Sequence, residues 1–113
     1  MWVDFETFRS LLKRTGIPVY RNKAVNNEDY PFIVYTHAFE KDKRASNKLV
    51  RNIKTFQVSF FTTGTEEDIN VLTNIFNAYP IGYAPFRSIS GDENDDTVTN
   101  FFTYVEVIYK IGE

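Results

Sequence analysis

The strictest constraint on this sequence is the alternation of apolar and polar side chains between Ile53 and Thr62. Phe56, Val58 and Phe60 fall on one face of an extended chain, and the residues between them are mostly polar. Successive side chains of a β-strand point to opposite faces, so a period of two indicates a half-buried strand. The segment therefore predicts a sheet with one buried face.

Other segments predict further strands. Residues 32–39 (FIVYTHAF) alternate with apolar side chains on both faces, which favours a place inside the sheet or at an edge that pairs with a partner. We expect Phe39 to share a face with Ile33. The last strand is expected at 101–111, and short extended pieces at 17–20 and 81–90.

Two amphipathic helices are expected. The first spans 4–15, with Asp4 as N-cap and Gly16 as the residue that ends it. The second spans 66–78 and begins after Thr65, and acidic residues in its first turn complement the helix dipole.

The expected order is α-β-β-β-α-β-β within a single domain covering residues 1–113. Short connections favour antiparallel pairing, and two one-sided helices can cover one side of a sheet. The predicted fold class is α+β: a mainly antiparallel sheet of about four or five strands with two helices packed on one face.

Aromatic residues make up 17% of the chain, with eleven Phe and seven Tyr. Global disorder is excluded, because it requires a chain poor in aromatic residues. A core this small does not readily hide so many rings, so we expect some of them at interfaces.

The chain has no cysteine, which excludes a disulfide framework, a thiolate zinc site and a cysteine nucleophile, and favours an intracellular protein. The first residues do not resemble a signal peptide, and no apolar run reaches the roughly 20 residues of a membrane span. The net charge of −2 gives no reason to expect specific nucleic-acid recognition.

No catalytic site is expected. His37 is the only histidine, and with no cysteine it cannot complete a common zinc site or a nucleophile–base pair. We interpret it as a structural or interface residue. Phosphate-binding and nucleophile-elbow motifs are absent, so the sequence predicts no enzyme, no cofactor and no metal.

An acidic run at 92–96 invites a calcium interpretation; its carboxylates are Asp92, Glu93, Asp95 and Asp96. An EF-hand loop needs a central glycine and a closing glutamate, and Gly91 precedes the run instead. We favour a solvated acidic loop, with weak cation binding as the alternative.

A basic segment covers 41–54, and its candidate interaction residues are Lys41, Lys43, Arg44, Lys48 and Arg51. The segment is expected to be a hairpin, with an exposed connection at its polar centre, residues 44–48. Three interpretations remain open: a solvated hairpin, an arm that docks on an acidic surface of another subunit, and a contact with nucleic acid. The last is weakened because no aromatic residue separates the cations.

The whole chain also resembles a known group of proteins. The first helix ends in residues 15–20 (TGIPVY), a polar loop leads to 30–35 (YPFIVY), and a charged hairpin leads to 56–62 (FQVSFFT). An acidic-capped helix and an aromatic final strand follow. This order resembles the small neck and tail-completion proteins of long-tailed bacteriophages and prophages, including tail terminators.

The resemblance implies a structural virion protein, assembled in the host cytoplasm, that forms a ring, commonly a hexamer. Such a ring caps the tail tube and joins it to the head connector, so the implied partners are other copies, the tail-tube protein and the head-completion protein. Two alternatives remain: an adaptor or regulatory domain that binds a protein partner through a sheet edge, and a small-ligand module that uses aromatic surface.

Overall fold

The computed structural model describes residues 3–24, 29–45, 48–79, 81–93 and 96–110, without the side chains of 41–51, 92–96 and 110. Its strands are β1 (Val3–Asp4), β2 (Val19–Arg21), β3 (Phe32–Ala45), β4 (Lys48–Thr62), β5 (Arg87–Glu93) and β6 (Asp96–Lys110). Its helices are α1 (Phe5–Lys13), the 3-10 helix η1 (Glu66–Ile69) and α2 (Asn70–Ala78). The α+β class is confirmed.

The six strands form one curled sheet in the order β1-β6-β4-β3-β2, with β5 also paired to β6. The prediction of a mainly antiparallel sheet of about four or five strands is wrong in two respects. The described sheet has six strands, and it is mixed, because β1 pairs parallel with β6 and β2 pairs parallel with β3. Residues 22–31 connect β2 to β3 in the sequence, and the two strands run in the same direction. The pairs β3–β4, β4–β6 and β5–β6 are antiparallel.

Helix α1 forms much as its sequence predicts. The backbone N–H of Thr7 donates a 2.8 Å hydrogen bond to Oδ1 of Asp4, which is the N-cap. After the helix, Gly16 adopts a φ of +77°, a left-handed conformation that side chains with a Cβ rarely take.

The second helical segment begins as predicted but is divided. Thr65 caps the 3-10 helix η1 by accepting a hydrogen bond from the N–H of Glu67, and α2 follows directly. The hydroxyl of Thr62 donates to a carboxylate oxygen of Asp68 at 2.7 Å, which ties η1 to the end of β4.

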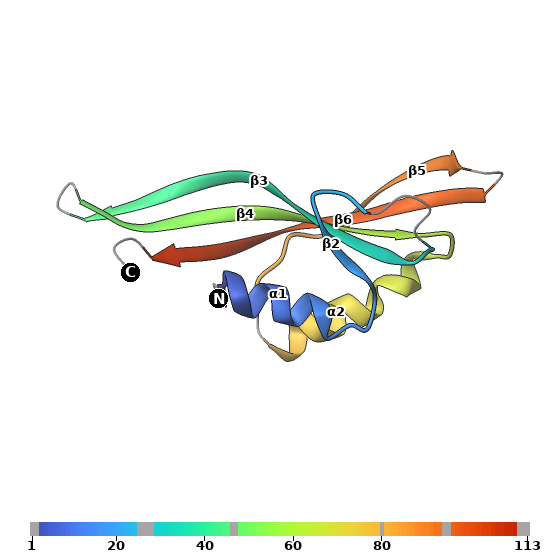
Figure 1. Cartoon of the computed structure of the whole chain (residues 1–113), viewed down its shortest axis with the longest axis horizontal. Coiled ribbons are helices and arrows are strands. Elements are labelled where there is room, and N and C mark those ends of the chain that lie inside the picture. The colour runs from blue at the N-terminus through green and yellow to red at the C-terminus, as the bar shows by residue number, and fades with distance from the viewer. Residues whose placement is uncertain (1–2, 25–28, 46–47, 80, 94–95, 111–113) are drawn as a thin grey trace.

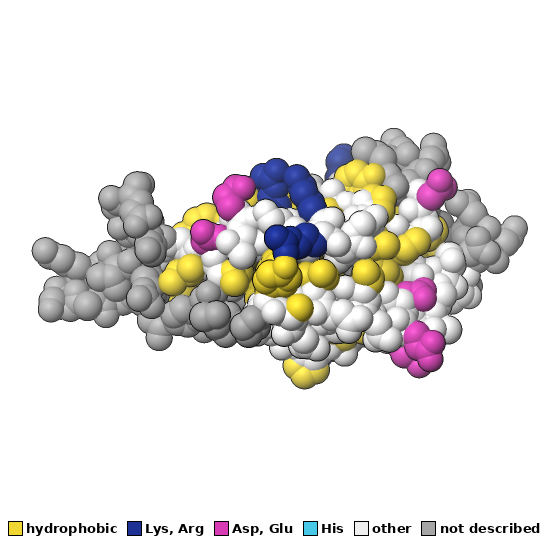
Figure 2. Space-filling view, turned by 90° about the horizontal axis from the view of Figure 1, so that it is seen from below, with side chains coloured by type: hydrophobic (Ala, Val, Ile, Leu, Met, Phe, Trp, Pro, Cys, Tyr) yellow, Lys and Arg dark blue, Asp and Glu magenta, His cyan; other side chains and the backbone are white. Residues whose placement is uncertain are grey.

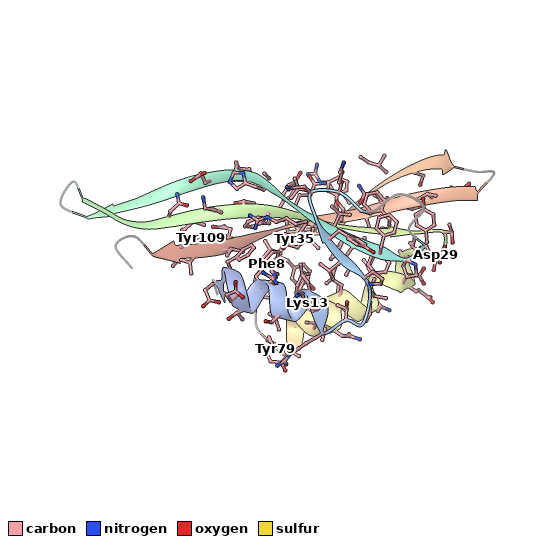
Figure 3. All side chains as sticks on the ribbon, in the orientation of Figure 1. Phe8, Lys13, Asp29, Tyr35, Tyr79 and Tyr109 are labelled. Atoms are coloured by element: carbon pink, nitrogen blue, oxygen red, sulfur yellow. The ribbon has the colours of Figure 1, made fainter. Side chains whose placement is uncertain are left out.

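Both helices lie on the same side of the sheet, as Figure 1 shows. The core between them and the sheet is rich in aromatic rings, and Phe8 points from α1 toward Tyr35 on the sheet (Figure 3). Their ring centroids are 5.6 Å apart in an edge-on arrangement, and Phe56 stacks on Phe8 at 5.4 Å. Six of the described aromatic side chains are buried: Phe8, Phe32, Tyr35, Phe56, Phe60 and Phe76.

Three strands are far longer than the usual five or six residues. Strand β3 has 14 residues, and β4 and β6 have 15 each. These strands give the molecule an elongated shape of 56 × 26 × 22 Å and carry two hairpins past the helices (Figure 1).

Two predicted elements need correction. The segment 81–90 is not one short strand: Tyr83 makes an isolated bridge to Val105, and β5 begins only at Arg87. The face assigned to Phe39 is also wrong. The β3–β4 register shifts between His37 and Phe39, and this irregularity moves Phe39 to the face opposite Ile33.

Candidate functional site

The predicted basic segment is part of the sheet. Lys41, Lys43 and Arg44 are residues of β3, and Lys48 and Arg51 are residues of β4. The expected hairpin is present, but its strands are longer than expected, because the backbone continues both strands to Ala45↔Lys48. In Figure 1 these strands extend past both helices. We call residues 40–54 the positive hairpin.

The predicted acidic loop is also mostly strand. Asp92 and Glu93 belong to β5 and Asp96 begins β6, with Glu93 paired to Asp96, while Asp95 lies outside the described residues. We call residues 87–98 the negative hairpin. By sequence the positive hairpin has six cations and two anions, and the negative hairpin has one cation and four anions.

The two hairpins lie at opposite ends of the long axis (Figure 1). Strand β4 runs from Lys48 in the positive hairpin to Thr62, and Thr62 pairs with Thr99 just beyond the negative hairpin. The two ends of β4 are fourteen residue steps apart, which is roughly 45 Å at about 3.3 Å per residue. A contact between the hairpins therefore requires two copies of the chain.

A polar cluster lies at the base of the positive hairpin. The side-chain amide of Asn52 donates a 2.7 Å hydrogen bond to Oε2 of Glu40, and Nζ of Lys54 is 3.6 Å from the same oxygen. Nε2 of His37 is 3.5 Å from Oε1 of Glu40. The Asn52 hydrogen bond, together with Lys54 and His37, holds the pKa of the Glu40 carboxyl below its usual value.

This cluster was not predicted from the sequence. The His37 ring also meets Phe56 edge-on, with ring centroids 5.9 Å apart. Next to the cluster, Lys54 lies over the ring of Tyr109, 5.0 Å from its centroid, and burial raises the pKa of the Tyr109 phenol. These contacts join β3, β4 and β6 where the positive hairpin leaves the body.

Three large apolar side chains are exposed among the described residues: Phe39 (57%), Ile89 (64%) and Tyr79 (42%). Phe39 belongs to the positive hairpin's strand β3 just before its charged part, and Ile89 belongs to the negative hairpin. Sequence alternation could have found Ile89, which sits between two serines. It could not find Phe39, because the register shift is not visible in the sequence pattern.

Two observations on the described residues bear on a metal or ligand site. They contain no group of three or more His, Asp and Glu side chains placed to hold a metal ion. An open depression of about 270 Å³ lies beside α1, where the guanidinium of Arg14 donates a hydrogen bond to the hydroxyl of Tyr79. It is lined by Glu6, Thr7, Ser10, Leu11, Arg14 and Tyr79.

Charge on the helix side of the molecule is mixed. Figure 2 shows the described Lys and Arg side chains near the middle of this face and Asp and Glu side chains on either side of them. Such a pattern differs from the basic stripe of a nucleic-acid interface. In the described part of the chain, no helix is long and apolar enough to cross a bilayer.

Comparison with known proteins adds no family assignment. No protein-family model matches the chain, and no curated protein is significantly similar to it.

Proposed function

We propose that the chain is a structural, non-enzymatic protein of a bacteriophage or prophage neck, of the tail-terminator type. In this proposal, copies form a ring that caps the tail tube and joins it to the head connector. The observation that carries the proposal is the placement of two hairpins of opposite sequence charge at opposite ends of one elongated sheet.

A head-to-tail contact is the simplest use of this placement. One end of a copy meets the other end of the next, which is a heterologous interface, and heterologous interfaces close into rings when the rotation between copies permits. Exposed charge pairs contribute only about 0–1 kcal/mol each, so they would set orientation and encounter rate. Exposed apolar side chains such as Phe39 and Ile89 would supply the more durable contact.

A second candidate function is an adaptor domain that binds a protein partner at a sheet edge. One observation favours it: in the described residues, no strand pairs with β3 between Thr36 and Ala45 on the side away from β4. Such an edge accepts an extended peptide by strand addition. An adaptor of this kind would stay monomeric and leave tail tubes unbound.

Charge reversal in the positive hairpin tests the first proposal. Replacing Lys43, Arg44 and Lys48 by Glu should preserve the circular dichroism spectrum, because the core described above is built from other residues. The variant should fail in ring formation on a sizing column and in a tail-joining assay, since the hairpin would then repel its acidic partner.

A matched control makes the same change in charge elsewhere. Arg9, Lys13 and Lys23 lie outside both hairpins, and their replacement by Glu should leave assembly unchanged. If the hairpin variant assembles and completes tails as well as the control does, the positive hairpin is a solvated extension and the proposed contact is wrong.

A further inference from the structure

The two long sides of the sheet differ in how fully they are paired. Three segments lie beside β6 on the side away from β4. Strand β5 pairs with β6 residues 96–102, Tyr83 and Ala84 bond to β6 residues 104–105, and β1 pairs with β6 residues 107–108. This side is therefore paired along almost its whole length.

The opposite side is open. Strand β2 pairs with β3 only at residues 33–35, and the N–H of Asn22 adds one hydrogen bond to the carbonyl of Tyr35. From Thr36 to Ala45, no described strand pairs with this side of β3. Strand β5 is likewise paired on one side only, with β6. Among the described residues, each hairpin thus has one open edge.

The exposed apolar side chain of each edge lies on the same face of the sheet. Phe39 pairs with Thr55 of β4. Ile89 pairs with Asn100 of β6, and Asn100 in turn pairs with Phe61 of β4. Thr55 and Phe61 are six residues apart in a register without a shift, so their side chains share a face. It is the face away from the helices, because Phe56 packs against α1.

The strand directions are also compatible. Strands β3, β4, β6 and β5 succeed one another in antiparallel pairs, so β5 is antiparallel to β3 within one molecule. Copies set side by side in one orientation bring β5 of one copy antiparallel to β3 of the next. This is the ordinary arrangement of an antiparallel ladder.

We propose that copies of this chain join edge to edge, with β5 of one copy added to the open part of β3, residues 36–45, of the next. The inference rests on the proposed self-assembly and specifies its contact. The partner is a second copy of the chain, because the two open edges run antiparallel to each other and carry their exposed apolar side chains on one face. They lie at opposite ends of one molecule and so cannot meet within it. The unpaired backbone N–H and C=O groups of an open edge form a template for pairing with another strand.

The geometry also fits a closed ring. Within one molecule, the positions of Phe39 and Ile89 are offset by six residues along the strands, which is roughly 20 Å. Edge pairing therefore displaces neighbouring copies along their strands. A closed sheet accommodates such a displacement by tilting its strands relative to the ring axis.

Lysine on either edge should block pairing, because a charged side chain would be carried into the contact. At a concentration at which the wild type forms oligomers on a sizing column, Phe39→Lys and Ile89→Lys should each be monomeric. Tyr79→Lys is the matched control: it changes the third exposed large apolar residue, which lies after α2, and should assemble like the wild type.

Mixing the variants tests the head-to-tail arrangement. Phe39→Lys keeps an intact β5 edge and Ile89→Lys keeps an intact β3 edge, so an equimolar mixture should form a dimer and nothing larger. A mixture that stays monomeric contradicts the inference. If Ile89→Lys alone still dimerises, β3 pairs with itself and the inference is also wrong.

The same series separates this inference from the proposed function. Variants that still form the wild-type oligomer and complete tails overturn edge pairing and leave the neck function standing. Edge pairing is also overturned if the wild type is monomeric at every concentration and the equimolar mixture of Phe39→Lys and Ile89→Lys forms no dimer. The tail-joining assay then decides the proposed function by itself.

Discussion

Asn52 and Glu40 are joined across β4 and β3 by a 2.7 Å hydrogen bond from the Asn52 amide to Oε2 of Glu40, at the base of the positive hairpin. This hydrogen bond is the largest cause of the lowered pKa of Glu40. It also links the two strands where they leave the helix-covered body.

We expect Asn52→Ala to raise the pKa of the Glu40 carboxyl toward its usual value, because the variant cannot donate this hydrogen bond. The measurement is a carboxyl titration followed by NMR. Gln57→Ala is the control, since the Gln57 amide donates to Ser59 instead and its loss should not move the Glu40 pKa. An unchanged pKa in Asn52→Ala would show that the hydrogen bond does not form.

The same pair predicts a pH dependence of stability. The folded-state pKa of Glu40 is below the unfolded value, so its contribution to stability is present above the unfolded pKa of about 4.3. That contribution is lost as the pH falls through the lowered folded pKa. The difference in unfolding free energy between wild type and Asn52→Ala should therefore shrink in acid, as measured by urea denaturation at several pH values. A difference that grows in acid would contradict the assignment.

The buried and exposed phenylalanines should respond differently to truncation. Phe8 is 0% exposed in the core, so Phe8→Ala should cost about 3–5 kcal/mol of unfolding free energy. Phe39 is 57% exposed, so Phe39→Ala should stay within about 0.5 kcal/mol of the wild type in the monomer. Urea denaturation at low protein concentration measures both. Equal losses would mean that Phe39 packs within its own molecule.

Two glycines offer a matched test of backbone conformation. Gly16 has a φ of +77° and Gly91 lies in β5, and a Cβ added at either position would meet nothing within 4 Å. Gly16→Ala should therefore destabilise the protein by roughly 1 kcal/mol through its backbone alone. Gly91→Ala should be neutral or slightly stabilising. Thermal unfolding of both variants checks this, and a tolerated Gly16→Ala would contradict the left-handed conformation at the end of α1.

Local signals in the sequence predicted the elements that depend on local physics. Asp4 and Gly16 mark the ends of α1 because a cap hydrogen bond and a positive φ are properties of a few neighbouring residues. Thr65 predicts the start of the second helical segment for the same reason. The apolar face of β4 followed from its alternation, since Phe56, Val58 and Phe60 are all buried.

The parallel edges of the sheet could not be predicted in this way. Strand β1 has two residues, and one of them, Asp4, is also the helix cap, so no strand pattern is long enough to recognise. Strand β2 has three residues. The direction of both pairs depends on where the chain returns in space, which is a long-range property of the fold.

The charged residues of the candidate site were predicted from the sequence, but the long strands that carry most of them were not. Runs of Lys, Arg and Asp are typical of loops, but β-propensity depends strongly on context, and here the neighbouring strand pairs hold the charged residues in long hairpins. The register shift before Phe39 has no counterpart in the alternation of residues 32–39. Both differences come from strand pairing across the sheet.

The most direct measurement for the proposed neck function is electron microscopy of tail tubes from the phage or prophage that encodes the chain, incubated with the purified wild-type protein. Sedimentation of the same mixture gives the amount bound. The proposal predicts tubes that end in a ring and a fixed whole number of copies sedimenting with each tube end. Bare tube ends, with the chain left in the supernatant at its monomer mass of 13.2 kDa, would contradict it.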